Sequence, residues 1–472
     1  MPSVRFRRMP LPCRALSFAC LLLALAPSAL APPAQAADAE TGLARLMVLD
    51  PGHFHAALLQ KETLAGVSST VSVYAPLGPD LFAHLNRIAL YNNRAEQPTH
   101  WSSRIYAGAD YLERMLAEHP GNIVVLSGRN SGKIETIQRA LDAGVHVLAD
   151  KPWILEAAEL PKLERALATA RRKHLIAYDV MTQRYEISEL LQRELVRDRA
   201  IFGDAVPGTR EAPGITMQSV HHLLKLVSGQ PNLRPCWFFD IRQQGEGVTD
   251  VATHLVDLVQ WMVAPDAPLD YRRDVQVLGA TRWATPISAA EFQRVTGEAA
   301  IPASLQPLVR DGRLQYFANN SVDYVFKGIH TSMLLEWKYE APEGGGDTEL
   351  AIFRGTLSHV ELRQGAEEKY HPEVYIVPSR ADLQSPLRTA LQSKIKELGK
   401  LYPGIALRES GGRFQIAIPD ALRIGHEAQF ALLGRRFLDY VKNPATIPQW
   451  EDSFVLAKYY TTTKAAELAT GR

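Results

Sequence analysis

Short apolar runs alternate with amphipathic stretches along the first part of the chain. The runs have the length and composition of buried strands and lie at residues 46–49, 71–74, 122–126, 145–148 and 175–178. The stretches between them have helical spacing and lie at residues 54–64, 110–118, 133–143 and 156–173. This alternation predicts an α/β fold with a Rossmann-like, doubly wound parallel sheet. A long polar stretch at 86–104 precedes the stretch at 110–118.

The pattern changes in the second part of the chain. A helix is predicted at 186–197, and loops rich in Pro and Gly follow it. Polar and apolar side chains then alternate as in strands at 322–339, 348–363 and 370–377. Helical spacing returns near the end of the chain, at 423–442 and 453–468. We therefore expect an α+β domain with an open, mostly antiparallel sheet. The predicted boundaries are 37–180 for the Rossmann-like domain and 181–472 for the second domain.

The first 36 residues differ in composition from the rest. Four Arg precede an apolar run at 15–25, and the small-residue site Ala34-Gln35-Ala36 follows, as in a cleaved export signal. The run is too short to span a membrane, so we expect an exported, periplasmic protein with no membrane segment in its mature form. Arg7-Arg8 leaves Sec and twin-arginine export both open.

Charge and cysteine content narrow the function classes. Without residues 1–36, 48 basic residues face 51 acidic residues, and this balance does not favour binding to nucleic acid or to an anionic membrane. Cys236 is the one cysteine left after residue 36, so the mature chain has no internal disulfide.

One stretch in the second part groups residues that can move protons. If residues 250–257 are helical, then Asp250, His254 and Asp257 project from one face. A carboxylate beside an imidazole can set its tautomer and its pKa, as acid–base catalysis requires. The alternative is a helix start at which Asp250 caps amides and His254 packs.

Two motifs in order resemble a known family. Asp150-Lys151-Pro152 at a strand end, followed by the stretch 247–257, is similar to the Gfo/Idh/MocA oxidoreductases, which act on sugars and cyclitols. The segments 414–419, 425–430 and 450–451 resemble the subgroup with a "putative oxidoreductase" C-terminal domain. The resemblance implies that Lys151 holds the reacting oxygen, His254 takes the hydroxyl proton, and Asp250 orients that proton.

The resemblance also implies NAD or NADP as cofactor and a carbohydrate or polyol as substrate. The fingerprint G-x-G-x-x-G maps onto residues 50–55, where only Gly52 matches; Asp50 brings a carboxylate and His55 fills a position meant to be small. The expected cofactor-binding residues are Gly52, His53, Phe54, Asn130, Asp150 and Lys151. The expected substrate-binding residues are Arg184, His222 and Asp257.

Other readings stay open at this point. A redox-neutral glycoside hydrolase that retains its NAD would suit an exported enzyme, and a carbohydrate-binding protein with a decayed cofactor site is a third possibility. Several histidines invite a metal interpretation, among them His53 and His55, and His221 and His222. No pair has a recognised zinc spacing, so no metal site is predicted. The sheet of the second domain could pair two subunits, although no residue indicates it.

Overall fold

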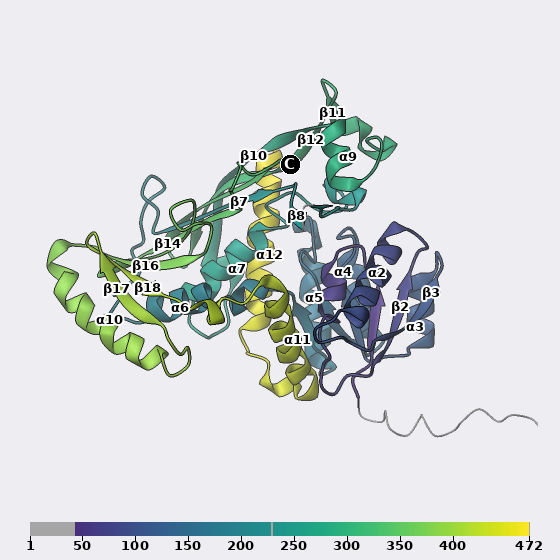
Figure 1. Ribbon diagram of the computed structural model, residues 1–472, viewed down its shortest axis with the longest axis horizontal. Helices are drawn as coiled ribbons and strands as arrows, with labels where there is room; N and C mark the ends of the chain where they lie inside the picture. The colour runs from purple at the N-terminus through teal and green to yellow at the C-terminus, as the bar shows by residue number, and fades with distance from the viewer. Residues whose placement is uncertain (1–42, 228–229, 472) are drawn as a thin grey trace, which may run out of the picture. The chain divides into compact units, whose positions relative to one another are not determined.

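The first sheet has six parallel strands in the order β3-β2-β1-β4-β5-β6. In Figure 1 it lies on the right, where β2 and β3 are labelled. The computed structural model describes residues 43–227 and 230–471; the predicted export signal lies outside them. The strands are β1 (Leu46–Leu49), β2 (Thr70–Ala75), β3 (Ser102–Ala107), β4 (Ile123–Leu126), β5 (His146–Ala149) and β6 (Ala177–Asp179). The chain reverses its direction of winding between β1 and β4, so the carboxyl ends of these two strands flank a crevice.

Alternate residues of these strands pack against helices on the two faces. Val48 belongs to the apolar cluster of one face, whereas Met47 and Leu49 belong to the cluster of the other. The covering helices from this part of the chain are α1 (His55–Leu58), α2 (Pro79–Asn93), α3 (Tyr111–Glu118), α4 (Lys133–Asp142) and α5 (Leu160–Arg172).

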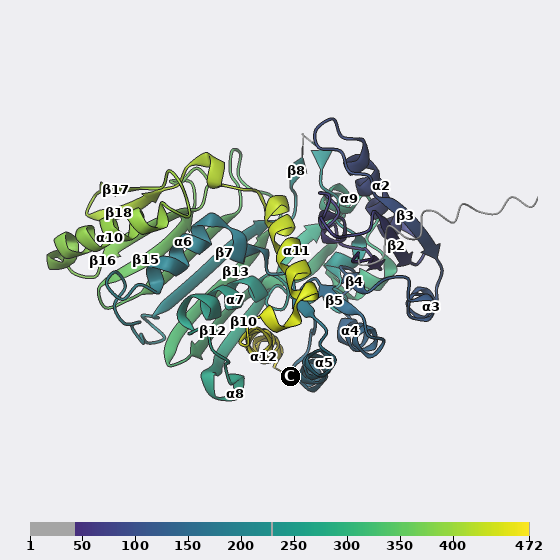
Figure 2. The same ribbon diagram turned by 90° about the horizontal axis from the view of Figure 1, so that it is seen from below.

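Two helices from the C-terminus complete this packing. Phe430, Leu433 and Phe437 of α11 (His426–Lys442) join one cluster, and Val455 and Tyr459 of α12 (Glu451–Thr470) join the other. Both views show α11 and α12 between the two sheets (Figures 1 and 2). The apolar packing of the first sheet therefore depends on the last 50 or so residues of the chain as well as on its own segment.

The second sheet is large and mostly antiparallel. Its main path runs β10-β12-β13-β7-β14-β15-β16-β18-β17, and only the β13–β7 pair is parallel. The strands are β7 (Ile215–His222), β10 (Val275–Ser288), β11 (Val309–Arg310), β12 (Arg313–Phe326), β13 (Ile329–Lys338), β14 (Thr348–Arg354), β15 (Ser358–Gln364), β16 (Glu373–Pro378), β17 (Ala406–Ser410) and β18 (Arg413–Ala417). The predicted fold class, a doubly wound parallel sheet followed by an open, mostly antiparallel sheet, is confirmed.

Helices cover one face of the second sheet. Apolar side chains from α6 (Ile187–Val196), α7 (Ala252–Val263) and α10 (Gln384–Leu398) pack with the sheet in one cluster, and α12 lies against both α7 and β10. Smaller elements are α8 (Tyr271–Asp274), α9 (Ala289–Thr296), the short hairpin of β8 (Leu226–Val227) and β9 (Gln230–Pro231), and the 3-10 turn η4 (Cys236–Phe239). Within the described ranges, no helix has the length and apolarity that a membrane crossing needs.

Several local predictions are wrong. The predicted helix at 54–64 shortens to the four residues of α1, and the polar stretch at 86–104, to which no element was assigned, contains the end of α2 and the start of β3. Pro79 is in the first turn of α2. Proline is favoured there because the main-chain N–H that it lacks would have no acceptor within the helix. The loop-rich region contains the central strand β7 and the long strand β10. The predicted helix at residues 250–257 begins only at Ala252, so Asp250 lies in the preceding turn.

Candidate active site

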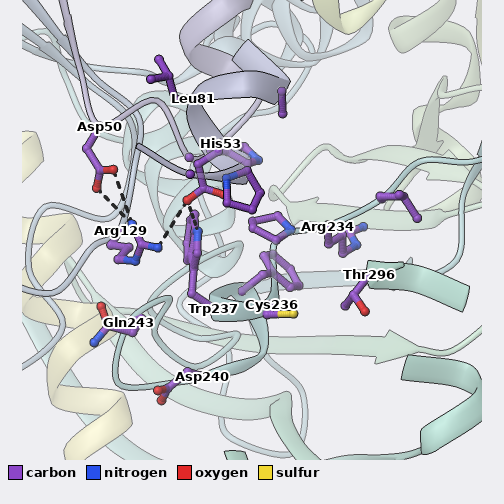
Figure 3. A pocket seen from close by; sticks show the side chains of 18 of the residues that line it. Asp50, His53, Leu81, Arg129, Arg234, Cys236, Trp237, Asp240, Gln243 and Thr296 are labelled. Atoms are coloured by element: carbon purple, nitrogen blue, oxygen red, sulfur yellow. Dashed lines mark hydrogen bonds and ion pairs between the residues drawn. The ribbon is translucent and has the colours of Figure 1, made fainter. Parts of the chain in front are cut away.

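The turn after β1 carries a carboxylate where the fingerprint has its first glycine. Asp50 has a left-handed backbone (φ 44°), and Arg129 lies 3.4 Å from its carboxylate. The same guanidinium lies 3.3 Å from the carboxylate of Asp80. Figure 3 shows the guanidinium of Arg129 facing the carboxylate of Asp50, with dashed lines between them. One cation thus offsets two carboxylates at this end of the sheet, and the pKa of Asp50 is raised because burial outweighs the attraction of Arg129.

Trp237 covers the glycine of the fingerprint. A Cβ added to Gly52 would lie 2.8 Å from Cζ2 of Trp237, so only glycine allows this contact. The indole Nε1 donates a hydrogen bond to Asp80 (2.9 Å), and the guanidinium of Arg129 stacks 5.4 Å from the ring centre. Sequence analysis expected Gly52 to face a ligand; in this conformation an indole from η4 lies against it.

A cavity of about 700 Å³ opens beside this contact. It lies at the carboxyl ends of β1, β2 and β4, and η4 with its flanking loop closes the opposite side. Three of the predicted cofactor residues line it, namely Gly52, His53 and Phe54. Asn130 does not line it, because its side chain is buried and donates a 2.7 Å hydrogen bond to the carbonyl of Gln244.

Asp150, at the end of β5, gathers three donors on one carboxylate oxygen. Nδ1 of His53 and Nδ1 of His55 lie 2.8 and 2.9 Å from Oδ2, and the hydroxyl of Ser127 donates to the same atom at 2.9 Å. Burial lowers the pKa of both imidazoles, to about 4 for His55. His53 therefore lines the cavity and also contacts Asp150, the residue that follows β5.

The next residue, Lys151, forms an ion pair with Asp250. Its Nζ donates to Oδ1 of the carboxylate, and both side chains are nearly buried. Burial alone would lower the pKa of Lys151, but the carboxylates of Asp250 and Asp150 outweigh it and raise that pKa. The lysine is therefore held as an ammonium group at the strand end.

The loop before α7 is fixed by close packing on the second sheet. A Cβ at Gly247 would lie 2.0 Å from the carbonyl oxygen of Ala318 in β12, and the main-chain amide of Val248 donates to Asn320 at 2.8 Å. Gly245 adopts a left-handed backbone (φ 94°) that side chains disfavour. These contacts set the position from which Asp250 meets Lys151.

His254 follows on the first turn of α7. Its Nδ1 is buried and has no hydrogen-bond partner within the part of the chain that the structure describes. Burial, together with the charge of Lys151, holds the pKa of His254 well below its ordinary value, so the imidazole is neutral near pH 7. Lys151, Asp250 and His254, which the sequence predicted as a centre, therefore act on one another electrostatically.

The predicted substrate residues Arg184 and Asp257 have buried partners instead. Arg184 pairs in two-pronged fashion with Asp257 (2.7 Å for both contacts) and lies 2.9 Å from Glu451 of α12. Lys458 completes the network, 3.2 Å from Asp257 and 2.8 Å from Asp179. Arg184 and Asp257 do not line the cavity, and the contacts they make join β6, α7 and α12.

Among the described residues, His222 makes its side-chain hydrogen bond with Asp347 and not with Lys151, Asp250 or His254. It ends β7, is buried, and its Nδ1 lies 3.1 Å from Asp347. His221 and Lys225 approach the same carboxylate at 3.3 and 2.6 Å. His221 and Lys225 hold the pKa of Asp347 far below its usual range even though burial opposes the shift.

A family profile decides the classification of the chain. The profile described as "Putative oxidoreductase C terminal domain" matches residues 191–470, more than half of the sequence. The chain belongs to this family. The predicted resemblance to Gfo/Idh/MocA oxidoreductases of this subgroup is thereby confirmed. No curated protein matches the chain.

Solved structures support the same family. A crystal structure described as "a putative oxidoreductase from Parabacteroides merdae" is 44% identical, with a TM-score of 0.89 over 91% of this chain and 98% of the other. GenD2, from gentamicin A biosynthesis and solved with NAD, is 15% identical (TM-score 0.55; 91% and 95% covered). KijD10, a 3-ketoreductase from Actinomadura kijaniata solved with NADP, is 14% identical (TM-score 0.54; 91% and 98% covered). At these identities GenD2 and KijD10 share the fold with this family member.

Sequence reasoning missed several charged residues around the centre. Lys133 of α4 is buried and donates to Asn130 (2.5 Å) and to the carbonyl of Asp150 (2.8 Å); burial lowers its pKa to about 8. Lys458 was also missed, and Glu451 was noted as part of the family resemblance. The ring of His426 lies 5.1 Å from that of His55. Helical periodicity carried no sign of these partners because each comes from a distant segment.

Proposed function

We propose that this family member is an NAD(P)-dependent oxidoreductase that removes hydride from the carbinol carbon of a carbohydrate or polyol. The ion pair of Lys151 with Asp250, held beside His254 at the carboxyl end of β5, carries the proposal. Parallel doubly wound sheets bind their ligands at this edge. GenD2 and KijD10, solved with NAD and NADP, lend support through their shared fold alone.

The residues of the cavity are compatible with a dinucleotide. The cavity of about 700 Å³ lies at the switch between β1 and β4 and has a size typical of small-molecule sites. The partly exposed guanidinium of Arg129 offers positive charge for a phosphate in place of the two missing glycines. Asp50 and Asp80 compete for that guanidinium, so we expect weaker binding than a complete fingerprint would give.

The proposed roles follow from charge. When bound, NAD(P) supplies the hydride acceptor. The ammonium of Lys151 holds the substrate oxygen as negative charge develops on it, and Asp250 keeps that ammonium in place. The neutral imidazole of His254 accepts the hydroxyl proton, since it lies within electrostatic range of Lys151 and carries no charge of its own.

Binding of the nicotinamide cofactor tests the proposal. Native protein should release NAD or NADP on heat denaturation, or show a rise in melting temperature when either is added. Arg129→Met should reduce that rise, whereas Arg388→Met, a change in an exposed ion pair far along the chain, should not. Absence of nicotinamide and of any shift in folded wild-type protein would contradict the proposal and favour a carbohydrate-binding protein.

The redox-neutral glycoside hydrolase is separated by its products. A retained nicotinamide that cycles within each turnover would release an aglycone from a glycoside without net formation of reduced cofactor. Net formation of reduced cofactor from a free polyol or sugar supports the oxidoreductase instead.

We also propose that the protein is exported. Four Arg, an apolar run and the Ala34-Gln35-Ala36 site support this part of the proposal. Amino-terminal sequencing of protein from the periplasm should begin at Ala37. Full-length protein confined to the cytoplasm would contradict export and leave the enzymatic proposal standing.

A further inference from the structure

Three side chains from two distant segments converge on one point beside the cavity. His53 lies in the turn after β1, His55 begins α1, and Asp150 directly follows β5. One ligand atom from each side chain can be chosen so that all lie within 4.8 Å of one another. The two Nδ1 atoms approach the same carboxylate oxygen at 2.8 and 2.9 Å.

The two carboxylate oxygens of Asp150 differ in the number of hydrogen bonds that they accept. Oδ2 of Asp150 takes three donors, from His53, His55 and Ser127, while Oδ1 is buried and has no hydrogen-bond partner within the described ranges. A buried carboxylate oxygen without a donor costs free energy, so such atoms are uncommon. Two imidazole nitrogens and a carboxylate oxygen are also a donor set found in zinc sites.

We propose that His53, His55 and Asp150 bind one divalent first-row transition metal ion of the zinc type. Imidazole nitrogen and carboxylate oxygen are ligands that suit Zn²⁺, Co²⁺ or Mn²⁺, whereas Mg²⁺ prefers oxygen alone. This site goes beyond the proposed hydride transfer and does not rest on it. It also departs from the sequence expectation of no metal, which considered spacing along the chain only.

The distances need a small adjustment for an ion. Ligand bonds of about 2.1 Å in tetrahedral geometry separate the ligand atoms by about 3.4 Å, so the side chains must spread by about 0.5 Å. The His53 side chain, 22% exposed, has room to do so on the cavity side.

The surroundings hold the carboxylate and leave an approach open. Nζ of Lys133 donates to the carbonyl oxygen of Asp150 and Ser127 donates to its carboxylate, so the residue is oriented from two sides. The neighbouring charge of Lys151 is matched by Asp250. Three protein ligands leave a coordination position for water or for a ligand oxygen that enters through the cavity.

Metal content measures the site directly. Full-length mature protein is stripped with chelator, dialysed against Zn²⁺ or Co²⁺, and analysed by elemental mass spectrometry and, for Co²⁺, by visible absorption. We expect one ion per chain and a rise in melting temperature with Zn²⁺, but not with Mg²⁺ at the same concentration. His53→Gln and His55→Ala should weaken binding at least tenfold, roughly the loss seen even for supporting residues. His119→Ala, at an exposed histidine, should bind like the wild type.

Circular dichroism shows whether each variant is folded. His53→Gln changes the more exposed ligand and keeps the proposal testable if His55→Ala fails to fold. Folded wild-type protein that takes up no stoichiometric Zn²⁺ or Co²⁺ would overturn the site. Stoichiometric uptake that is unchanged in folded His53→Gln and His55→Ala would overturn it too, because the ion would then sit elsewhere. Neither readout uses nicotinamide or substrate, so failure here leaves the hydride-transfer proposal to its own test.

Discussion

Lys151 and Asp250 form a nearly buried ion pair although 99 positions separate them in the sequence. The lysine lies just beyond the carboxyl end of β5 in the parallel sheet, and the aspartate lies in a turn that packs on the antiparallel sheet. The pair thus brings a cation and its orienting carboxylate together across the two halves of the fold, next to His254.

The first prediction separates chemistry from stability in this pair. Lys151→Met should reduce turnover by about 10²–10³-fold because the developing oxyanion loses its cation. It should also destabilise the fold by about 3 kcal/mol, since Asp250 is left as an unpaired buried carboxylate. Adding Asp250→Asn should restore most of the stability but none of the activity, as measured by urea unfolding and steady-state kinetics. Recovery of activity in the double variant would refute the role of Lys151.

Substitution of His254 should lower activity strongly and stability only slightly. Its Nδ1 makes no hydrogen bond within the described part of the chain, so His254→Ala should change the free energy of unfolding by only about 1 kcal/mol. Turnover should fall by about 10²–10⁴-fold because the hydroxyl proton loses its acceptor. Kinetics and thermal unfolding of the same preparation check both values. A variant that is strongly destabilised yet fully active per folded molecule would make His254 a packing residue.

Lys458 should matter for folding. Its side chain is 0% exposed and pairs with Asp179 and Asp257. Lys458→Met leaves two buried carboxylates with less compensation and should cost about 3–5 kcal/mol in urea unfolding. Arg388→Met, which breaks an exposed pair with Glu409, is the matched control and should be indistinguishable from the wild type. Equal effects in the two variants would contradict a structural role for the buried network.

A pair of buried glutamates predicts how stability changes with pH. Burial and the nearby carboxylates raise the pKa of Glu189 and Glu349, for Glu349 to about 7. Because the folded state favours the protonated form, this stabilisation is fully present below the unfolded pKa of about 4.3 and is lost as pH rises through 7. Glu349→Gln should therefore raise the melting temperature at pH 8 and change it little at pH 4. The exposed Glu367→Gln should show no such difference between the two pH values.

The sequence predicted the parts of the site that depend on strand order, and missed those that depend on distant packing. Lys151 at a strand end and His254 on a helix could be placed from apolar periodicity and the family motif. The contacts of Arg184 could not, because Asp257 and Glu451 lie 73 and 267 positions away. Strand β10 was missed since Gly279 and Pro286 interrupt its pattern and its pairing with β12 shifts register twice.

The domain organisation could also be predicted only in part from the sequence. The predicted boundary near residue 180 marks the end of the first sheet, but α11 and α12 return from the C-terminus to cover it. Phe437 and Tyr459 have the spacing of apolar positions in any amphipathic helix. This spacing does not indicate which sheet the helices cover.

Reduction of a nicotinamide cofactor is the most direct test of hydride transfer. Wild-type protein is mixed with NAD or NADP and a panel of monosaccharides, glycosides and polyols, and the near-ultraviolet absorbance of reduced nicotinamide is followed. At least one compound should produce reduced cofactor with the wild type and none with Lys151→Met. Folded wild-type protein that binds the dinucleotide but reduces none of it with any member of the panel would contradict the proposed oxidoreductase.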